Sequence, residues 1–296
     1  MYPSGFVDYR RPSSLGEALE LARLWGEDAI YIAGGMSLMQ AMKSRLLSPE
    51  YLIDLNGIAE LRGINASGKC IRIGAMTRYR EVATSSSLGP FQALADAAGH
   101  VGDRQVRNRG TVGGSLAWNY VSACTPIAAL ACGANVLIMH PDSSTSSYKI
   151  DDFQQGPLTT ALQPNDLLYC IELAKPRHRA GSAYRKWGIV KDALPVIGFG
   201  CYLEIDGQGR CLTARIAIGG LENGPERASE AEQQMVGELD LEDPAIITKI
   251  ARTASESTST AGDHWVSAEY KSHLIERLGS DVLSLAVLRA KEIGHG

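Results

Sequence analysis

The sequence has no excess of basic residues. Lysine and arginine together number 29, against 33 aspartate and glutamate residues, which gives a formal net charge of −4 at pH 7. Proteins whose main partner is a nucleic acid carry an excess of Lys and Arg that neutralises phosphates. The charge balance therefore argues against nucleic acid as the main partner of this chain.

The sequence also lacks a long apolar segment. Its longest nearly apolar run, residues 126–139, contains Gly133 and Asn135 and is shorter than the roughly 20 residues that a membrane-spanning helix needs. The N-terminal stretch MYPSGFVDYRRPSS has no apolar core of the kind found in secretion signals. We therefore expect no transmembrane segment and a cytoplasmic location.

The cysteines form no C-x-x-C pair, the pattern typical of structural zinc and iron–sulfur sites. The six are Cys70, Cys124, Cys132, Cys170, Cys201 and Cys211. Because they are scattered in apolar stretches, we expect buried, reduced thiols that serve core packing, with Cys124 as the exception discussed below. The histidines lie in separate segments, and no spacing of Ser, His and Asp indicates a catalytic triad. The sequence thus predicts no metal site and no catalytic residue.

The length of 296 residues suits two domains, each large enough to bury a core. In the first part, short apolar strands alternate with helical spacing, a pattern of α+β or α/β proteins. A capping box at Ser14–Glu17 begins a helix that is expected to reach about Trp25. A second helix is expected over residues 37–46, and a hairpin with the polar turn PDSSTSS follows residue 135.

The second part is expected to follow the stretch AKPRHRAGS, residues 174–182, which mixes Pro, Gly and basic residues without an apolar period. We predict domains over residues 1–177, with subdomains of about 1–56 and 57–177, and over residues 178–296. Three apolar strands, the last two joined by the turn DGQG, and then three helices predict a small α+β domain. The last helix is expected over about 267–292, with an apolar stripe from Tyr270 to Leu288, and the Ser/Thr cluster at 253–262 is expected to be a loop.

Two glycine loops are the most specific local feature. AGGMSLM, residues 33–39, follows an apolar strand, and GTVGGSLA, residues 110–117, has a similar Gly-Gly turn. Glycine lets a ligand approach the backbone closely, and successive backbone N–H groups form a nest that suits phosphate oxygens. Neither loop is a G-x-G-x-x-G or a Walker A motif. The pattern alone leaves open whether paired amide cradles hold the diphosphate of a dinucleotide or the loops are merely tight turns.

The longer sequence around these loops resembles the flavin-binding subunit of the molybdenum hydroxylases. This family includes the carbon monoxide, xanthine, quinoline and nicotine dehydrogenases. The resemblance rests on AGGMSLMQAMKSRLLSPEYLIDLNGIAELRGI and VRNRGTVGGSLA, and continues in NDLLYCIELAKP, AYRKWG and GDHWVSAEYKSHLIERL. It covers nearly the whole chain in the expected order. It implies an α+β fold: a two-part FAD-binding domain of the vanillyl-alcohol-oxidase (PCMH) type, then a small α+β domain with a three-stranded antiparallel sheet and helices.

The resemblance also implies which residues hold FAD, with its diphosphate between the two loops. The matching positions are Ala33, Gly34, Gly35, Met36, Ser37 and Leu38 in the first loop, and Thr111, Gly114 and Ser115 in the second. The main chain at Leu167 or Leu168 would border the isoalloxazine ring. Lys186 would lie near the ring, where a cation stabilises negative charge on the reduced flavin.

One stretch departs from the family pattern. Where the family has an Asp in a sequence such as ASDLP, whose carboxylate binds sugar-chain hydroxyls of FAD, this chain has Cys124 in SACTP. A thiol is a poor hydrogen-bond acceptor. Losing the charged acceptor would cost FAD binding ~1.5–3 kcal/mol unless Ser122 or Thr125 replaces it.

By this resemblance, the chain is the FAD-dependent oxidoreductase subunit of a molybdenum hydroxylase and transfers electrons. A large partner subunit would hold molybdopterin, a small one would hold [2Fe-2S] clusters and supply the electrons, and an external acceptor would take them. The assembly implied is a dimer of heterotrimers. The altered segment 118–125 leaves two alternatives open: a stand-alone flavin-dependent oxidoreductase, or a degenerate scaffold subunit without FAD.

Overall fold

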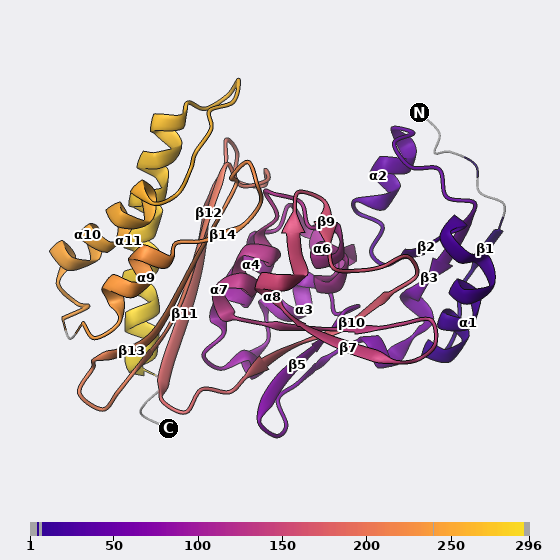
Figure 1. Ribbon diagram of the computed structural model, residues 1–296, viewed down its shortest axis with the longest axis horizontal. Coiled ribbons are helices and arrows are strands. Elements are labelled where there is room, and N and C mark those ends of the chain that lie inside the picture. Colours follow the sequence, from indigo (N-terminus) through magenta and orange to yellow (C-terminus); the bar gives the residue numbers. More distant parts are fainter. Residues whose placement is uncertain (1–4, 6–7, 239, 293–296) are drawn as a thin grey trace.

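The first part of the chain is a small parallel sheet with strand order β1-β3-β2 (Figure 1). The structure is a computed structural model that describes residue 5, residues 8–238 and residues 240–292. The elements of this part are β1 (Asp8–Arg10), α1 (Leu15–Trp25), β2 (Ala29–Ile32), α2 (Leu38–Lys43) and β3 (Tyr51–Asp54). The first glycine loop therefore links the end of β2 to the start of α2.

Helix α1 begins and ends where the sequence predicts, whereas α2 ends early. The Ser14 hydroxyl accepts a hydrogen bond from the Glu17 backbone N–H, which confirms the predicted cap. Helix α2 stops at Lys43 because Arg45 takes a left-handed conformation with φ of 60°, which ends the helical hydrogen bonding. Leu46 is consequently 79% exposed and does not join the buried face of α2.

The second part is a five-stranded sheet with strand order β4-β5-β10-β6-β7, in which every neighbouring pair is antiparallel. Its strands are β4 (Ile64–Asn65), β5 (Cys70–Gly74), β6 (Asn135–Met139), β7 (Thr145–Lys149) and β10 (Leu167–Ala174). Strands β6 and β7 form the predicted hairpin. Between β5 and β6 lie α3 (Tyr79–Ala83), α4 (Gln92–His100), α5 (Arg104–Arg109), α6 (Val112–Trp118) and α7 (Cys124–Cys132).

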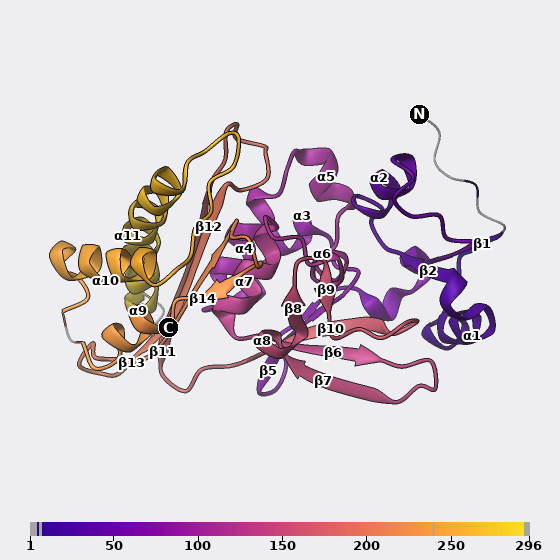
Figure 2. The same ribbon diagram turned by 45° about the horizontal axis from the view of Figure 1, so that its top comes forward.

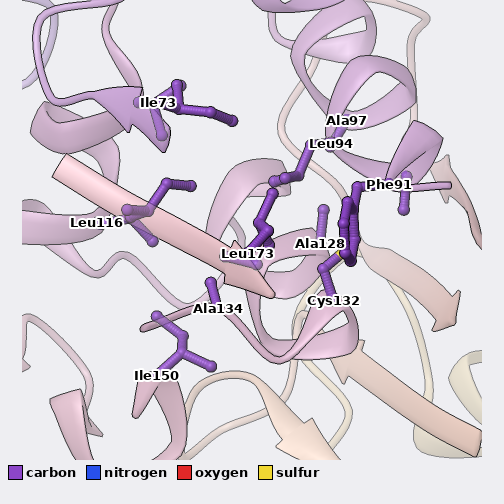
Figure 3. Close-up of a cluster of buried hydrophobic side chains, with 14 of the residues drawn as sticks. Ile73, Phe91, Leu94, Ala97, Leu116, Ala128, Cys132, Ala134, Ile150 and Leu173 are labelled. Atoms are coloured by element: carbon purple, nitrogen blue, oxygen red, sulfur yellow. The ribbon is translucent and has the colours of Figure 1, made fainter. Parts of the chain in front are cut away.

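The main core of this part lies between the five-stranded sheet and the helices inserted into it. Ile73 and Leu173 of the sheet face Leu94 of α4 and Leu116 of α6 (Figure 3). Alternate residues of a strand point to one face, so β5, β6 and β10 each give a row of apolar side chains to this core. Beyond β7, α8 (Ile150–Phe153) and the small strands β8 (Gln154–Gly156) and β9 (Thr159–Thr160) close the core at one end.

The third part is an antiparallel sheet with strand order β11-β12-β13-β14, followed by three helices. Its elements are β11 (Arg179–Trp187), β12 (Ile197–Ile205), β13 (Cys211–Gly219), β14 (Glu226–Arg227), α9 (Ser229–Met235), α10 (Pro244–Glu256) and α11 (Ala268–Glu292). The three long strands and three helices confirm the predicted α+β architecture. The two-residue β14 adds a fourth strand at the edge, too short to stand out in the sequence.

Helices cover this sheet on both faces (Figures 1 and 2). Phe199 and Leu203 of β12 belong to the core shared with α10 and α11, whereas Tyr202 belongs to the core shared with α4 and α7. A strand that is buried on both faces has a continuous run of apolar residues in its sequence. This is why apolar and polar residues do not alternate along β12. At Gly219 a Cβ would lie 2.3 Å from the Cδ1 of Ile127, so α7 packs directly on the sheet.

Some predicted details of the third part are wrong. Strand β10 continues through Ala174 and β11 begins at Arg179, so the connection is shorter than the predicted stretch 174–182. The strands persist there because their residues pair with β5 and β12, and local composition does not reveal that pairing. Helix α10 likewise runs to Glu256, so the Ser/Thr cluster begins inside a helix. The division at residue 177 stays a prediction.

Helix α11 buries part of the predicted stripe, including Leu274 and Val282, but its two ends differ from the prediction. Tyr270 and Leu288 are 44% and 52% exposed, and the buried line includes small residues such as Ala286. A Cβ at Gly181 of β11 would lie 2.3 Å from the Ala286 carbonyl oxygen. The helix therefore approaches the sheet most closely at its small residues, and Leu274 and Leu283 are buried in the same core. Among the described residues, no helix is long and apolar enough to cross a membrane.

Asp96 of α4 ties the second part of the chain to the third. Its carboxylate accepts hydrogen bonds from both terminal nitrogens of Arg289 on α11, at 2.6 and 3.1 Å, and from the Tyr184 backbone N–H at 3.1 Å. Arg289 also donates to the Ser182 carbonyl oxygen at 2.8 Å. Because the pair is largely shielded from water and bidentate, it is stronger than a surface ion pair.

We expect Asp96→Ala to lower the free energy of unfolding by ~2–3 kcal/mol, since it leaves Arg289 without its carboxylate partner. Urea unfolding followed by circular dichroism measures this loss. The matched control is Asp281→Ala, which removes an exposed ion pair with Arg185 and should cost less than ~1 kcal/mol. Equal effects of the two substitutions would contradict the special role of Asp96.

All six cysteines are free thiols, as predicted, and all but the half-buried Cys70 are buried. Burial disfavours the charged thiolate. It raises the pKa of Cys132 from 9.0 to about 12 and the pKa of Cys170 and Cys211 to about 11. These thiols are therefore neutral in the folded protein at physiological pH.

The raised thiol pKa values predict that stability falls with pH above about 9. There the unfolded chain has released protons that the folded chain still binds, so the free energy of unfolding decreases as pH rises, by ~1.4 kcal/mol per pH unit for each such thiol. We expect Cys132→Ala to reduce the slope between about pH 9 and pH 11 by roughly this amount. Urea midpoints across that range measure the slope, and an unchanged slope in the variant would refute the assignment.

Candidate functional site

A cavity of about 1140 Å³ lies where the three parts of the chain meet. The first glycine loop, the second glycine loop with α6, residues 162–168 before and within β10, and the end of β11 with the following loop all line it. Pockets for small ligands occupy roughly 300–1,000 Å³. The cavity is thus large enough for an extended ligand of dinucleotide size.

The structure brings all the predicted site residues to this one cavity. Its lining includes Ala33, Gly34, Gly35, Met36, Ser37, Leu38, Thr111, Gly114, Ser115, Cys124, Leu168 and Lys186. They come from five separate stretches of the sequence, so their meeting is a result of the tertiary fold. Their contacts with FAD stay a prediction.

The first glycine loop presents a row of unused backbone N–H groups to the cavity. None of the N–H groups of residues 34–38 donates a hydrogen bond within the described part of the chain. Gly35 has φ of 74°, a left-handed conformation that glycine adopts without strain, and the Ser37 hydroxyl makes no cap at the start of α2. Such a row is suited to an anion, because each amide gains an acceptor when phosphate oxygens approach.

The second glycine loop differs, and the prediction of an amide cradle there is wrong. The backbone N–H groups of Val112 and Gly113 donate to Thr77 and Ala75 at 3.1 and 2.9 Å. The N–H of Gly114 donates to the Thr111 hydroxyl at 3.1 Å, the cap of α6. Protein acceptors therefore use these amides, and this loop can offer a ligand its surface and its side chains, but not a nest.

The two loops are in direct backbone contact. A Cβ at Gly34 would lie 2.2 Å from the carbonyl oxygen of Arg109, so only glycine fits there. The buried guanidinium of Arg78 donates to that same carbonyl oxygen and to the side chain of Asn56, and Asn56 in turn donates to the Ala33 carbonyl oxygen at 2.8 Å. Burial lowers the pKa of Arg78.

Sequence reasoning missed Arg78 and Asn56 as positioning residues. Arg78 precedes α3, a position at which an arginine is usually expected to be exposed to solvent. Asn56 follows β3 and belongs to no recognisable sequence motif. No local signal distinguishes either residue, because their partners are carbonyl and amide groups on distant segments. Together with Gly34 they fix the geometry of the amide row.

Cys124 and Lys186 lie at the end of the cavity next to the third sheet. Burial raises the pKa of the Cys124 thiol, and the nearby Tyr184 hydroxyl and Lys186 ammonium oppose the rise. The Lys186 ammonium donates to the carbonyl oxygen of Ala193 in the loop after β11. Thr125 is buried behind Cys124 and does not line the cavity, so it cannot replace the missing carboxylate from its present position.

The structure also assembles a Ser-His-Asp set that the sequence spacing did not indicate. His140 Nδ1 lies 2.7 Å from Asp166 Oδ1, and His140 Nε2 lies 2.8 Å from Ser146 Oγ. The three residues come from the β6–β7 hairpin and the turn before β10, which the register of the sheet brings together. Asp166 lines the cavity. Within the described residues, no group of three or more His, Cys, Asp and Glu side chains is placed to hold a metal ion.

Comparisons with known proteins match nearly the whole chain. Residues 5–176 match the FAD binding domain in molybdopterin dehydrogenase, and residues 182–285 match the CO dehydrogenase flavoprotein C-terminal domain. The carbon monoxide dehydrogenase medium chain of Afipia carboxidovorans is 33% identical over 98% of each chain. The glyceraldehyde dehydrogenase medium chain of Sulfolobus acidocaldarius is 31% identical, over 94% of this chain and 97% of its own.

A solved structure gives the same result in three dimensions. The chain superposes on a chain of the carbon monoxide dehydrogenase of Hydrogenophaga pseudoflava with a TM-score of 0.88 and 30% sequence identity. The superposition covers 98% of this chain and 99% of that chain. The likeness therefore extends over the parallel sheet, the five-stranded sheet and the third sheet with its helices.

We expect Gly34→Ala to destabilise the protein by ~1–3 kcal/mol, because the added methyl group forces the two loops apart. Thermal unfolding of the chain without added ligand measures the effect. The control is Gly16→Ala in α1, where a Cβ meets nothing within 4 Å and the substitution should stabilise by ~0.5–1 kcal/mol. A Gly34→Ala protein as stable as the wild type would contradict the close loop contact.

Proposed function

The chain belongs to the family of FAD-binding medium subunits of the molybdenum hydroxylases, and from this premise we propose how its cavity holds FAD. It is an FAD-dependent oxidoreductase subunit whose role is electron transfer within a multi-subunit enzyme. FAD supplies the redox chemistry when bound. The protein's own contribution is to bind the cofactor, orient it and adjust its electrostatic surroundings.

The observation that carries the placement is the row of unused N–H groups at residues 34–38 inside the large cavity. We propose that these amides donate to the diphosphate of FAD, and that the hydroxyl groups of Thr111 and Ser115 lie on its other side. The paired cradle expected from sequence is thus replaced by one cradle and one packing surface. Because the amides are neutral, the site binds the anion through fixed dipoles and needs no cationic side chain.

We propose that the ring end of FAD lies near Leu168 and Lys186. The Lys186 ammonium would stabilise negative charge on the reduced cofactor. Cys124 would occupy the place of the family's Asp, so the sugar-chain hydroxyls lack their charged acceptor there. The neutral thiol makes this contact weaker, and the amide row at residues 34–38 supplies most of the polar binding.

We further propose the assembly and its place in the cell. The partners would be a large molybdopterin subunit and a small [2Fe-2S] subunit, in a dimer of heterotrimers, with electrons passing from the iron–sulfur subunit to FAD and then to an external acceptor. The description of relatives as medium chains supports a multi-subunit enzyme. The free thiols support a cytoplasmic location.

The domain division is also a proposal: residues 1–177, with subdomains of about 1–56 and 57–177, and residues 178–296. The two family matches, 5–176 and 182–285, support it. The stand-alone flavin enzyme and the scaffold without FAD are not favoured, since the whole chain matches subunits of larger enzymes over nearly their full length.

We expect the purified chain to bind FAD with a flavin absorption spectrum, and Gly114→Val to weaken binding at least ~10-fold, equivalent to ~1.4 kcal/mol. A valine there would place its Cβ 2.8 Å from the Thr111 hydroxyl and its methyl groups against the cavity. Fluorescence titration with FAD measures the affinity. The control is Gly99→Val, where the nearest atom to a Cβ is Ala83 Cβ at 3.8 Å.

Each outcome of the titration has a clear meaning. A Gly114→Val protein with wild-type FAD affinity contradicts the placement of the diphosphate beside α6. A wild-type chain that stays colourless after incubation with FAD contradicts the proposed function and favours a scaffold. Purification from the native source then tests the assembly, because the proposal requires co-purifying chains that contain molybdenum and iron.

A further inference from the structure

We propose that Ser146, His140 and Asp166 form a proton relay between the protein surface and the cofactor cavity. The inference rests on the proposed function, in which FAD lies in this cavity with its ring near Leu168. Reduction of a flavin by two electrons is accompanied by uptake of protons, and a fixed chain of hydrogen bonds can deliver them to the part of the cavity that Asp166 lines. The three residues form a continuous chain of hydrogen bonds along such a route.

The chain of hydrogen bonds runs from a partly exposed group to a buried one. Asp166 has a side chain only 2% exposed and lines the cavity, whereas the side chain of His140 is 25% exposed. Ser146 lies on β7, the edge strand of the five-stranded sheet. Ser146 pairs with Ile138 of β6, and Ile138 pairs with Leu168 of β10. The side chains of Ser146, Ile138 and Leu168 therefore lie on the same face of the sheet.

The hydrogen bonds among these residues match those of a hydrolytic triad, but the wrong end of the set lies at the cavity for that chemistry. In a triad the serine is the nucleophile and must face the substrate, with oxyanion donors beside it. Here Asp166 lines the large cavity, and neither Ser146 nor His140 does. The member of the set at the cavity is therefore the carboxylic acid, which can give or take a proton.

The hydrogen-bond partners of His140 suit both of its protonation states. In the neutral ring, Nδ1–H donates to the Asp166 carboxylate and Nε2 accepts from the Ser146 hydroxyl. In the imidazolium both nitrogens donate, and the Ser146 hydroxyl turns to accept. The other oxygen of Asp166 accepts from the Gln163 backbone N–H at 2.9 Å. In the neutral ring protonated at Nδ1 and in the imidazolium, both ring nitrogens therefore keep a hydrogen-bond partner.

The transfer moves one proton and needs no oxidant or reductant. A solvent proton reaches Nε2 through the Ser146 hydroxyl and makes the imidazolium. The imidazolium gives its Nδ1 proton to Asp166 Oδ1, and the neutral carboxyl group gives a proton to a basic atom in the cavity. The carboxylate is then restored, and the ring returns to its first tautomer by exchange with water at its exposed edge.

Other ionisable groups lie beside this hydrogen-bonded set. Asp142 lies on the same hairpin turn, where its charge interacts with His140. Tyr31 of β2 lies near Asp166, and its hydroxyl donates to the Asn165 carbonyl oxygen at 3.3 Å. Burial and the Asp166 charge raise the pKa of Tyr31, so it stays a neutral hydroxyl beside the relay.

The experiment uses the full chain loaded with FAD and rapid mixing with reduced methyl viologen, which supplies electrons and no protons. A pH indicator in weakly buffered solution follows proton uptake, and absorbance follows flavin reduction. We expect His140→Gln to slow proton uptake by ~10- to 100-fold while FAD content is unchanged, and Ser146→Ala to slow it less. The matched controls are His178→Gln, at an exposed histidine outside the cavity, and Ser147→Ala, at the next residue of β7 on the other face.

A second measurement needs no cofactor. Nitrogen NMR of the chain without FAD should show neutral His140 protonated at Nδ1, and Ser146→Ala should shift the Nε2 resonance whereas Ser147→Ala should not. Proton uptake at the wild-type rate in His140→Gln, or a neutral ring protonated at Nε2, would overturn the relay and leave the proposed function intact. A chain that binds no FAD overturns both. Circular dichroism of each variant checks that the fold is kept.

Discussion

The site depends on one close contact between two stretches of backbone. Gly34 packs against the carbonyl oxygen of Arg109 with no space for a Cβ, and the buried Arg78 guanidinium binds the same oxygen. This contact fixes the position of the loop that follows, so that the N–H groups of residues 34–38 stay without internal partners and face the cavity. A chain can leave such groups unpaired only where water or a ligand accepts from them.

A second close contact sets the other end of the cavity. Helix α7 packs onto glycines of β12 and β13, and this places Cys124 at the start of α7 beside Lys186 on β11. The third sheet therefore contributes to the lining of the cavity, and helices of the second part form one of its two covering layers. The Asp96–Arg289 pair holds that arrangement from the side of α11.

The polar groups that line the cavity are neutral backbone amides and a few charged side chains. Unused backbone amides lie in the first glycine loop, the Lys186 ammonium lies at one end, and the Asp166 carboxylate is hydrogen-bonded to His140. This division fits a protein that holds a redox cofactor and leaves substrate chemistry to other chains. The tasks left to this chain are to hold the cofactor in place and to set its electrostatic surroundings, and the backbone amides, Lys186 and Asp166 are the groups placed to do so.

The sequence by itself determined the class of fold and the two glycine loops, because motifs and their order along the chain can be read without knowledge of contacts. Through its family resemblance it also pointed to residues that the fold brings to one cavity. It also determined the start of α1, where Ser14 and Glu17 are neighbours. It did not reveal the occupied amides of the second loop, whose acceptors Thr77 and Ala75 lie far back in the chain.

Only the tertiary structure decided which side chains meet across large sequence separations. It joined Arg78 to Arg109 and Asn56, and it joined His140 to Ser146 and Asp166. It also added small residues that fit against β11 to the buried face of α11, beside the expected Leu274 and Val282. The physical reason is the same in each case: local patterns encode which elements form, whereas close packing and hydrogen-bond partners depend on how distant elements come together.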